Sequence, residues 1–125
     1  MTEPIPERLR EWLTHAVRSG ASDLHLIPGH PPVTRLHGEL TEFPGPPLSE
    51  EEAGPLLLSL CSPAIAARLG THKDADFAFD MPLDGRSQRF RANLFHAGGH
   101  LAACLRVIPG TIPDFGWANF PIDLA

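Results

Sequence analysis

The stretch from Ala21 to Gly38, ASDLHLIPGHPPVTRLHG, constrains the fold more than any other part of the chain. In residues 23–26 leucines alternate with polar side chains, and residues 33–37 alternate in a similar way. A period of two is typical of strands with one buried face. Between them lies a Pro-Gly-His-Pro-Pro turn, in which Gly29 can adopt a positive φ and the prolines favour an extended exit. The stretch predicts a β-hairpin, or two strands joined by a slightly longer loop.

Helices are expected on both sides of this stretch. Residues 6–19 carry apolar side chains at spacings of three and four, which indicates an amphipathic helix that ends at Gly20. After a short third strand at 39–43 and a rigid PGPP loop, Ser49 and Glu52 have the spacing of a capping box. We expect a kink or an irregular turn at Pro55 in the helix that follows. A further short helix is expected to run from Ser62-Pro63 to Gly70.

Three more strands are predicted in the second half of the chain. Their ranges are 76–81, 88–95 and 100–108, separated by an Asp-Gly turn and an Ala-Gly-Gly turn. The last strand is apolar on both faces except at its ends and at Arg106, so we expect it in the middle of the sheet. Helices and strands are segregated along the chain. This order predicts an α+β fold, with a mostly antiparallel sheet and helices packed on one face.

Composition narrows the classes of protein that the chain can represent. A length of 125 residues indicates one domain, and a net charge of −5 argues against a non-specific nucleic-acid binder. Cys61 and Cys104 form no C-x-x-C pair, which favours reduced, buried thiols in a cytoplasmic protein. We see neither a signal peptide nor an apolar run of the roughly 20 residues that span a bilayer, and we therefore expect a soluble cytoplasmic protein.

Three segments together resemble the N-terminal domain of type IV pilus retraction ATPases (PilT-like), within the type II/IV secretion ATPase superfamily. They are SDLHL followed by PG, PP and R-x-x-G; DADFAFDMP; and QRFRANLFHAGGHLAACLRVIP. They lie between Ala21 and Pro113, in the family's order and at similar distances. The resemblance implies a PAS-like N-terminal domain at residues 1–110. Residues 111–125, apolar and rich in proline, would then be a linker toward a RecA-like ATPase domain.

The resemblance also implies a function. Family members are hexameric motors for twitching motility or secretion, in which this domain would have a regulatory and assembly role. It would contact the motor domain and neighbouring subunits, and transmit the nucleotide state by rigid-body rotation. The full-length protein would use ATP and Mg²⁺ and act on the cytoplasmic side of inner-membrane platform proteins. No cofactor, metal site or nucleic-acid partner is expected for this chain itself.

The motif that binds ATP in this family, G-x-x-x-x-G-K-[ST], does not occur in the sequence. The one lysine, Lys73, lacks the required glycines. We therefore expect no ATP hydrolysis by the chain alone, which would be either an expressed N-terminal fragment or a shortened paralogue. A reading frame that continues past Ala125 into a P-loop domain would distinguish the two. The isolated chain is expected to be a monomer or a weak dimer.

Three arginines are the candidate site residues, because they match the family's R-F-R and R-x-I-P motifs: Arg89, Arg91 and Arg106. In the family such arginines can approach the phosphates of a nucleotide held by a motor domain, where a cation stabilises the transferring phosphoryl group. Strand alternation places Arg89 and Arg91 on one face. The alternative is that all three are exposed residues paired with carboxylates such as Asp76, Asp80 or Glu39.

Two histidine-containing pairs are less favoured candidate sites. Asp23 and His25 share a strand face and could act as an acid–base or metal pair, and a hydrolase built on them is the least favoured function. The simpler interpretation makes Asp23 a turn cap and His25 a hydrogen-bonded surface residue. His96 and His100 flank a glycine turn, but the sequence places no third metal ligand beside either pair.

A free-standing PAS-like module is the other open function. It would bind a ligand or a protein, and its apolar pocket would be lined by residues such as Phe77, Phe79 and Leu105. Ligand screening of the isolated chain would test it.

Overall fold

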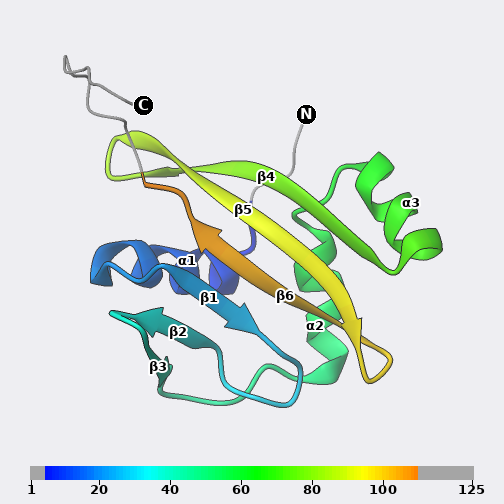
Figure 1. Cartoon of the computed structure of the whole chain (residues 1–125), viewed down its shortest axis with the longest axis horizontal. Helices are drawn as coiled ribbons and strands as arrows, with labels where there is room; N and C mark the ends of the chain where they lie inside the picture. The colour runs from blue at the N-terminus through cyan, green and yellow to red at the C-terminus, as the bar shows by residue number, and fades with distance from the viewer. Residues whose placement is uncertain (1–4, 110–125) are drawn as a thin grey trace.

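The computed structural model describes residues 5–109, so the expected linker at 111–125 lies outside the described residues. Three helices and six strands follow one another along this part of the chain (Figure 1). Their bounds are α1 Glu7–Ser19, β1 Asp23–Leu26, β2 Val33–Leu36, β3 Glu39–Glu42, α2 Glu50–Leu58, α3 Pro63–His72, β4 Asp74–Leu83, β5 Arg86–Ala97 and β6 His100–Val107.

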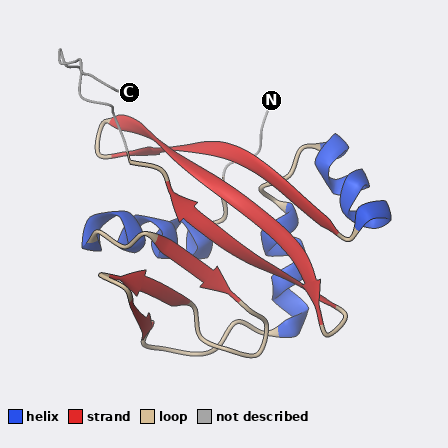
Figure 2. Ribbon diagram, viewed as in Figure 1, coloured by secondary structure: helices blue, strands red, loops and turns tan. Residues whose placement is uncertain are grey.

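The six strands form one sheet in the order β3-β2-β1-β6-β5-β4, and every neighbouring pair is antiparallel. The first three strands make one half, and the chain then passes through α2 and α3 to build the other half from its far edge inward (Figure 2). β6 closes the sheet by pairing with both β1 and β5, which confirms its expected central place. The predicted α+β, PAS-like architecture is therefore confirmed.

The loop between β1 and β2 is the longer of the two forms that the sequence allowed. It spans residues 27–32, and Gly29 within it has a φ of 88°. Its backbone N–H donates to the carbonyl of Leu48 at 2.7 Å, and the Leu48 N–H donates to the carbonyl of His30 at 3.0 Å. These bonds attach the loop to the segment that leads into α2, so the two strands need no tight turn to stay in register.

The helix ends follow local signals, with one correction. α1 ends at Gly20 with a φ of 82°, and both bonds of the Ser49–Glu52 capping box are present at the start of α2. Pro55 is accommodated inside α2. The expected end of α3 at Gly70 is wrong, because the helix runs on to His72 and stops where Lys73 adopts a φ of 68°. A single glycine costs a helix only about 1 kcal/mol, which the burial of Leu69 in the same turn can offset.

The core lies between the sheet and the helices α1 and α2, which sit behind it in the view of Figure 1. Leu24, Leu105 and Ala92 are direct neighbours across three strands, and all three are fully buried. The predicted aromatic inner face of β4 is confirmed by Phe79, which stacks on Phe90 with ring centroids 5.2 Å apart. Side chains that alternate with these residues must point to the opposite face of the sheet. No helix of residues 5–109 covers this face, which we call the helix-free face (Figure 1).

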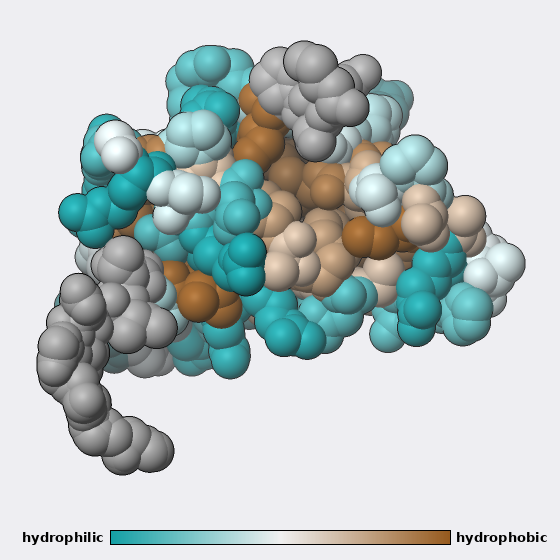
Figure 3. Space-filling view, turned by 90° about the horizontal axis from the view of Figure 1, so that it is seen from above, coloured by the Kyte–Doolittle hydropathy of each residue, from teal (hydrophilic) through white to brown (hydrophobic). Residues whose placement is uncertain are grey.

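Apolar side chains also reach the surface in a hollow on the side of the molecule seen in Figure 3. Phe77 and Phe79 are partly buried and pack against the core, and Leu105 lies within it. These three residues therefore contribute to the packing of the domain.

Within residues 5–109, no helix combines the length and the apolar character that crossing a membrane would require.

Candidate functional site

A row of charged side chains crosses the helix-free face of the sheet. Asp23 on β1 is the direct partner of Arg35 on β2 and of Arg106 on β6, and Arg106 is in turn the direct partner of Arg91 on β5. Directly paired residues project to the same face of a sheet and lie close together. We call these four residues, Arg35, Asp23, Arg106 and Arg91, the arginine row.

Asp23 is the one carboxylate within the row, and two arginines share it. Its Oδ1 lies 3.5 Å from Nε of Arg106, and its Oδ2 lies 3.7 Å from Nε of Arg35. Both distances exceed those of directed N–H···O hydrogen bonds, and Oδ1 has no hydrogen-bond partner among the described residues. The Asp23 side chain is only 11% exposed, whereas that of Arg106 is 68% exposed. The carboxylate thus lies beneath guanidinium groups that face outward.

Arg91 and Arg89 have more regular partners on the edge strand β4. Arg91 Nε donates to Asp76 at 3.0 Å, and Arg89 donates two hydrogen bonds to Asp80, at 2.9 and 3.2 Å. The guanidinium of Arg89 holds the pKa of Asp80 below its usual value, chiefly through these hydrogen bonds. Both arginine side chains are more than 60% exposed.

All three candidate arginines therefore lie on one face of the sheet and are paired, as the alternative interpretation of the sequence held. Two of the three carboxylates that it named are partners, since Arg89 pairs with Asp80 and Arg91 with Asp76. Arg106 instead pairs with Asp23, which it did not name. Exposed ion pairs contribute only about 0–1 kcal/mol each. Pairing of this kind leaves the guanidinium groups free to exchange a carboxylate for another anion.

The structural role expected for Asp23 and His25 is wrong in both parts. Asp23 caps no turn in the described part of the chain, because it begins β1 and lies between arginines of β2 and β6. His25 keeps Nε2 buried without a hydrogen-bond partner in the described part of the chain, and Cys104 is its direct neighbour on β6. Among residues 5–109 no three His, Cys, Asp or Glu side chains are grouped as a metal site would require.

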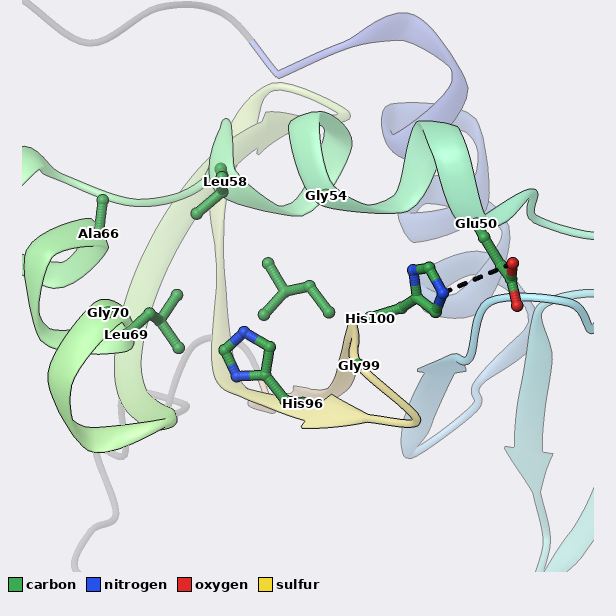
Figure 4. A pocket seen from close by; sticks show the side chains of 10 residues that line it. Glu50, Gly54, Leu58, Ala66, Leu69, Gly70, His96, Gly99 and His100 are labelled. Atoms are coloured by element: carbon green, nitrogen blue, oxygen red, sulfur yellow. Dashed lines mark ion pairs between the residues drawn. The ribbon is translucent and has the colours of Figure 1, made fainter.

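His96 and His100 line a pocket of ≈ 360 Å³ between α2, α3 and the β5–β6 turn (Figure 4). His100 Nε2 lies 3.5 Å from the Glu50 carboxylate at the start of α2, while His96 Nδ1 contacts the Lys73 carbonyl at 3.2 Å. The two rings are thus held by different partners. The rest of the pocket is mainly apolar and glycine-rich: Leu58, Leu69, Leu101, Ala66, Gly54, Gly70 and Gly99.

Sequence reasoning missed Arg35 and the bridging position of Asp23. Arg35 belongs to the R-x-x-G of the resembling stretch, and alternation alone shows only that it faces away from Thr34 and Leu36. The missing information is the strand order, because only the pairing of β1 with both β2 and β6 brings the residues together. An arginine and an aspartate on successive strands of a predicted hairpin were the available signal.

Comparisons with known proteins agree with this architecture. The type IV pilus retraction ATPase PilT of Pseudomonas aeruginosa is 30% identical over 104 residues, which are 83% of this chain and 29% of PilT. A twitching motility protein of Neisseria gonorrhoeae is 32% identical over 81 residues, or 65% of this chain and 21% of that protein. The chain thus spans less than a third of the length of these curated relatives. No protein-family model matches it.

Solved structures extend the similarity to nearly the whole chain. A crystal structure of the pilus retraction motor PilT with bound ADP superposes with a TM-score of 0.72 at 33% identity, covering 95% of this chain and 33% of PilT. The ATPase DotB of Legionella pneumophila gives a TM-score of 0.69 at 26% identity, covering 97% of this chain and 36% of DotB.

Fold and sequence together define a domain of the type II/IV secretion ATPase superfamily. Within that superfamily, the chain is an N-terminal domain of the type IV pilus retraction ATPase family.

Proposed function

We propose that the chain is the regulatory and assembly domain of a hexameric pilus-type motor and places arginines against a nucleotide bound by a motor domain. PilT of Pseudomonas aeruginosa and DotB of Legionella pneumophila are named as ATPases, and a PilT motor was solved with ADP. Work by the whole protein would be pilus retraction, twitching motility or secretion. The motor would act on the cytoplasmic side of inner-membrane platform proteins.

The direct pairing of Arg91 with Arg106 carries the proposal. Like charges directly opposite each other on neighbouring strands destabilise a sheet. Both guanidinium groups nevertheless face outward, with side chains 63% and 68% exposed. Two such groups side by side can each donate a planar pair of hydrogen bonds to phosphate oxygens. In a site closed by a neighbouring domain they would stabilise the charge on the transferring phosphoryl group.

Arg89 is a weaker member of the same group. It projects to the same face as Arg91, but two hydrogen bonds hold it to Asp80 on the edge strand. A phosphate would have to replace both bonds, whereas Arg91 has one such bond and Arg106 has none to Asp23. We therefore rank Arg106 and Arg91 ahead of Arg89 as phosphate contacts.

ATP and Mg²⁺ would be held by a motor domain outside this chain, since the sequence contains no G-x-x-x-x-G-K-[ST] loop. The contribution of this domain is then cationic and structural. Residues 1–110 would form the domain, residues 111–125 would lead to the motor domain, and neighbouring subunits of a homo-hexamer would be its partners. On its own the chain would not hydrolyse ATP.

Steady-state ATP hydrolysis by the complete motor that carries this domain tests the proposal. Arg91→Gln and Arg106→Gln should lower kcat by about 10³-fold, the lower end for arginines that contact a transferring phosphoryl group. Arg18→Gln is the matched control, because Arg18 is also an exposed arginine paired with an aspartate, at 2.7 Å from Asp84. Full activity of both variants, with intact hexamers and unchanged melting temperature, would refute the proposed contact.

The free-standing binding module receives no comparable support. The residues expected to line its pocket pack in or against the core. The pocket beside His96 and His100 has a different lining, and nothing in it identifies a ligand class.

A further inference from the structure

We infer that Arg35 is a third cation of the phosphate site and that Asp23 is a built-in counter-ion that positions Arg35 and Arg106. This inference rests on the proposed function and extends it to two residues on the other half of the sheet. The ligand class is a di- or triphosphate chain, which would lie along the arginine row across β2, β1, β6 and β5.

The geometry of Asp23 differs from that of the other sheet-face carboxylates. Asp76 and Asp80 are 50% and 45% exposed, lie on the edge strand and accept hydrogen bonds from one arginine each. Asp23 lies on an inner strand, is 11% exposed and has an arginine on either side at 3.5 and 3.7 Å. It is therefore placed to attract both neighbours without holding either in a directed bond.

Charge along the row favours an added anion. Its three arginines face two carboxylates, Asp23 within the row and Asp76 beside Arg91, which leaves one positive charge in excess. This local excess occurs on a chain whose net charge is −5, so it is a feature of this face and not of the whole domain. A buried carboxylate that attracts two guanidinium groups also reduces the repulsion between the cations before a ligand arrives.

Spacing within the row suits a chain of phosphates better than a single anion. Neighbouring strands are about 4.8 Å apart, so backbone positions from Arg35 to Arg91 extend over about 14 Å. Long arginine side chains can converge from these positions on several oxygens. The phosphate chain would then contact Arg35 and Arg106 from the solvent side. Asp23 would remain below them and keep their side chains directed along the row.

Tripolyphosphate, which has no base or sugar, is the probe that tests the row in the 125-residue chain. The readout is the set of arginine Nε–Hε NMR signals during a titration at constant ionic strength, which equalises general screening. The signals of Arg35, Arg106 and Arg91 should shift together on one binding curve. That of Arg18, paired with Asp84 away from the row, should stay in place.

Substitutions separate the roles of the residues. Arg35→Gln should weaken tripolyphosphate binding about tenfold through loss of a charge-assisted contact, and Arg18→Gln should leave binding unchanged. Asp23→Asn should broaden the unliganded Arg35 and Arg106 signals, because the counter-ion that positions both guanidinium groups is lost. Thermal unfolding of each variant would verify that the fold is retained.

The possible failures are distinguishable. A stationary Arg35 signal while Arg106 and Arg91 shift would overturn this inference and leave the proposed function intact. No binding, equal shifts at every arginine, or unchanged, sharp Arg35 and Arg106 signals in a folded Asp23→Asn chain would overturn it as well. If the row binds tripolyphosphate but the motor keeps full kcat with Arg91→Gln and Arg106→Gln, the proposed function fails and the anion site stands.

Discussion

Glu52 connects the first two helices, and its removal gives a sharp test of how the domain is held together. Its Oε2 accepts the Ser49 backbone N–H at 3.0 Å, while its own N–H donates to Ser49 Oγ at 3.1 Å. The guanidinium of Arg8 on α1 donates to both carboxylate oxygens of Glu52 and lies 4.8 Å from the centre of the Trp12 ring. One carboxylate thus caps α2 and attaches α1 to it.

Two substitutions of Glu52 separate the contribution of its ion pair with Arg8 from that of its cap on α2. Glu52→Gln keeps an acceptor for the Ser49 N–H but loses the charge, so it should cost about 0.5 kcal/mol, the usual value of a partly exposed ion pair. Glu52→Ala also removes the capping acceptor, which adds about 1 kcal/mol. We expect destabilisation of about 0.5 kcal/mol for the first variant and about 1.5 kcal/mol for the second.

Urea unfolding followed by circular dichroism measures both differences, and thermal unfolding provides a second readout. For a domain of this size, 1 kcal/mol corresponds to about 4 °C in Tm. Arg8→Gln and the Arg8→Gln/Glu52→Gln pair complete a double-mutant cycle that isolates the ion pair. Equal destabilisation by Glu52→Gln and Glu52→Ala would refute the capping role. A coupling energy near zero would show that Arg8 contributes nothing through its charge.

Acid should remove the same contribution. The Ser49 backbone N–H, together with the Arg8 guanidinium, holds the pKa of Glu52 below its ordinary value, although partial burial opposes this shift. A carboxyl with a lowered pKa in the folded state stabilises the fold above its unfolded pKa of about 4.3 and loses this effect as pH falls through its folded pKa. The stability gap between wild type and Glu52→Gln should therefore be full at pH 7 and shrink below about pH 4. A constant gap would contradict the assignment.

Three further predictions concern the core, a turn and the thiols. Leu105→Ala should cost about 2–5 kcal/mol in urea unfolding, because Leu105 is fully buried on the central strand. Gly85→Ala should cost about 1–2 kcal/mol in the same assay, because Gly85 has a φ of +80° although no atom lies near its missing Cβ; no loss would refute the strain. Cys61 and Cys104 are half-buried rather than buried as the sequence predicted, and this partial burial raises the pKa of both thiols, so both should react more slowly with a thiol reagent at pH 7 in the folded chain than in urea. Fast reaction of the folded chain would show that they are exposed.

Local patterns in the sequence were sufficient to assign strand faces. The alternation of aspartates with Phe77 and Phe79 predicted which side of β4 is apolar, and the structure confirms it. The β4–β5 hairpin could also be predicted from the sequence, because Asp84 and Gly85, both at positive φ, fix its turn and register. Asp76 and Asp80 could therefore be named in advance as possible partners of the arginines, although not which arginine each would pair with.

The bridging role of Asp23 could not be found in this way. It depends on the pairing of β1 with β6, whose residues are about 80 positions apart in sequence, as Asp23 and Arg106 show. No turn or spacing encodes that contact, since it results from the burial of Leu24 and Leu105 on the opposite face. Apolar packing on the opposite face thus brings the arginine row together. The sequence predicts which residues are apolar but not which strands they bring side by side.

Because apolar packing holds the arginine row in place, the row limits how the domain could respond to a nucleotide. Arg106 lies on β6, which is hydrogen-bonded to β1 and β5, and the residue before it is fully buried. An arginine on such a strand cannot follow a departing phosphate by local loop movement, because shifting its backbone would disturb the core and two ladders of hydrogen bonds. Under the proposed function, loss of the phosphate contact would therefore release or rotate the domain as one body, with the arginine row unchanged in shape.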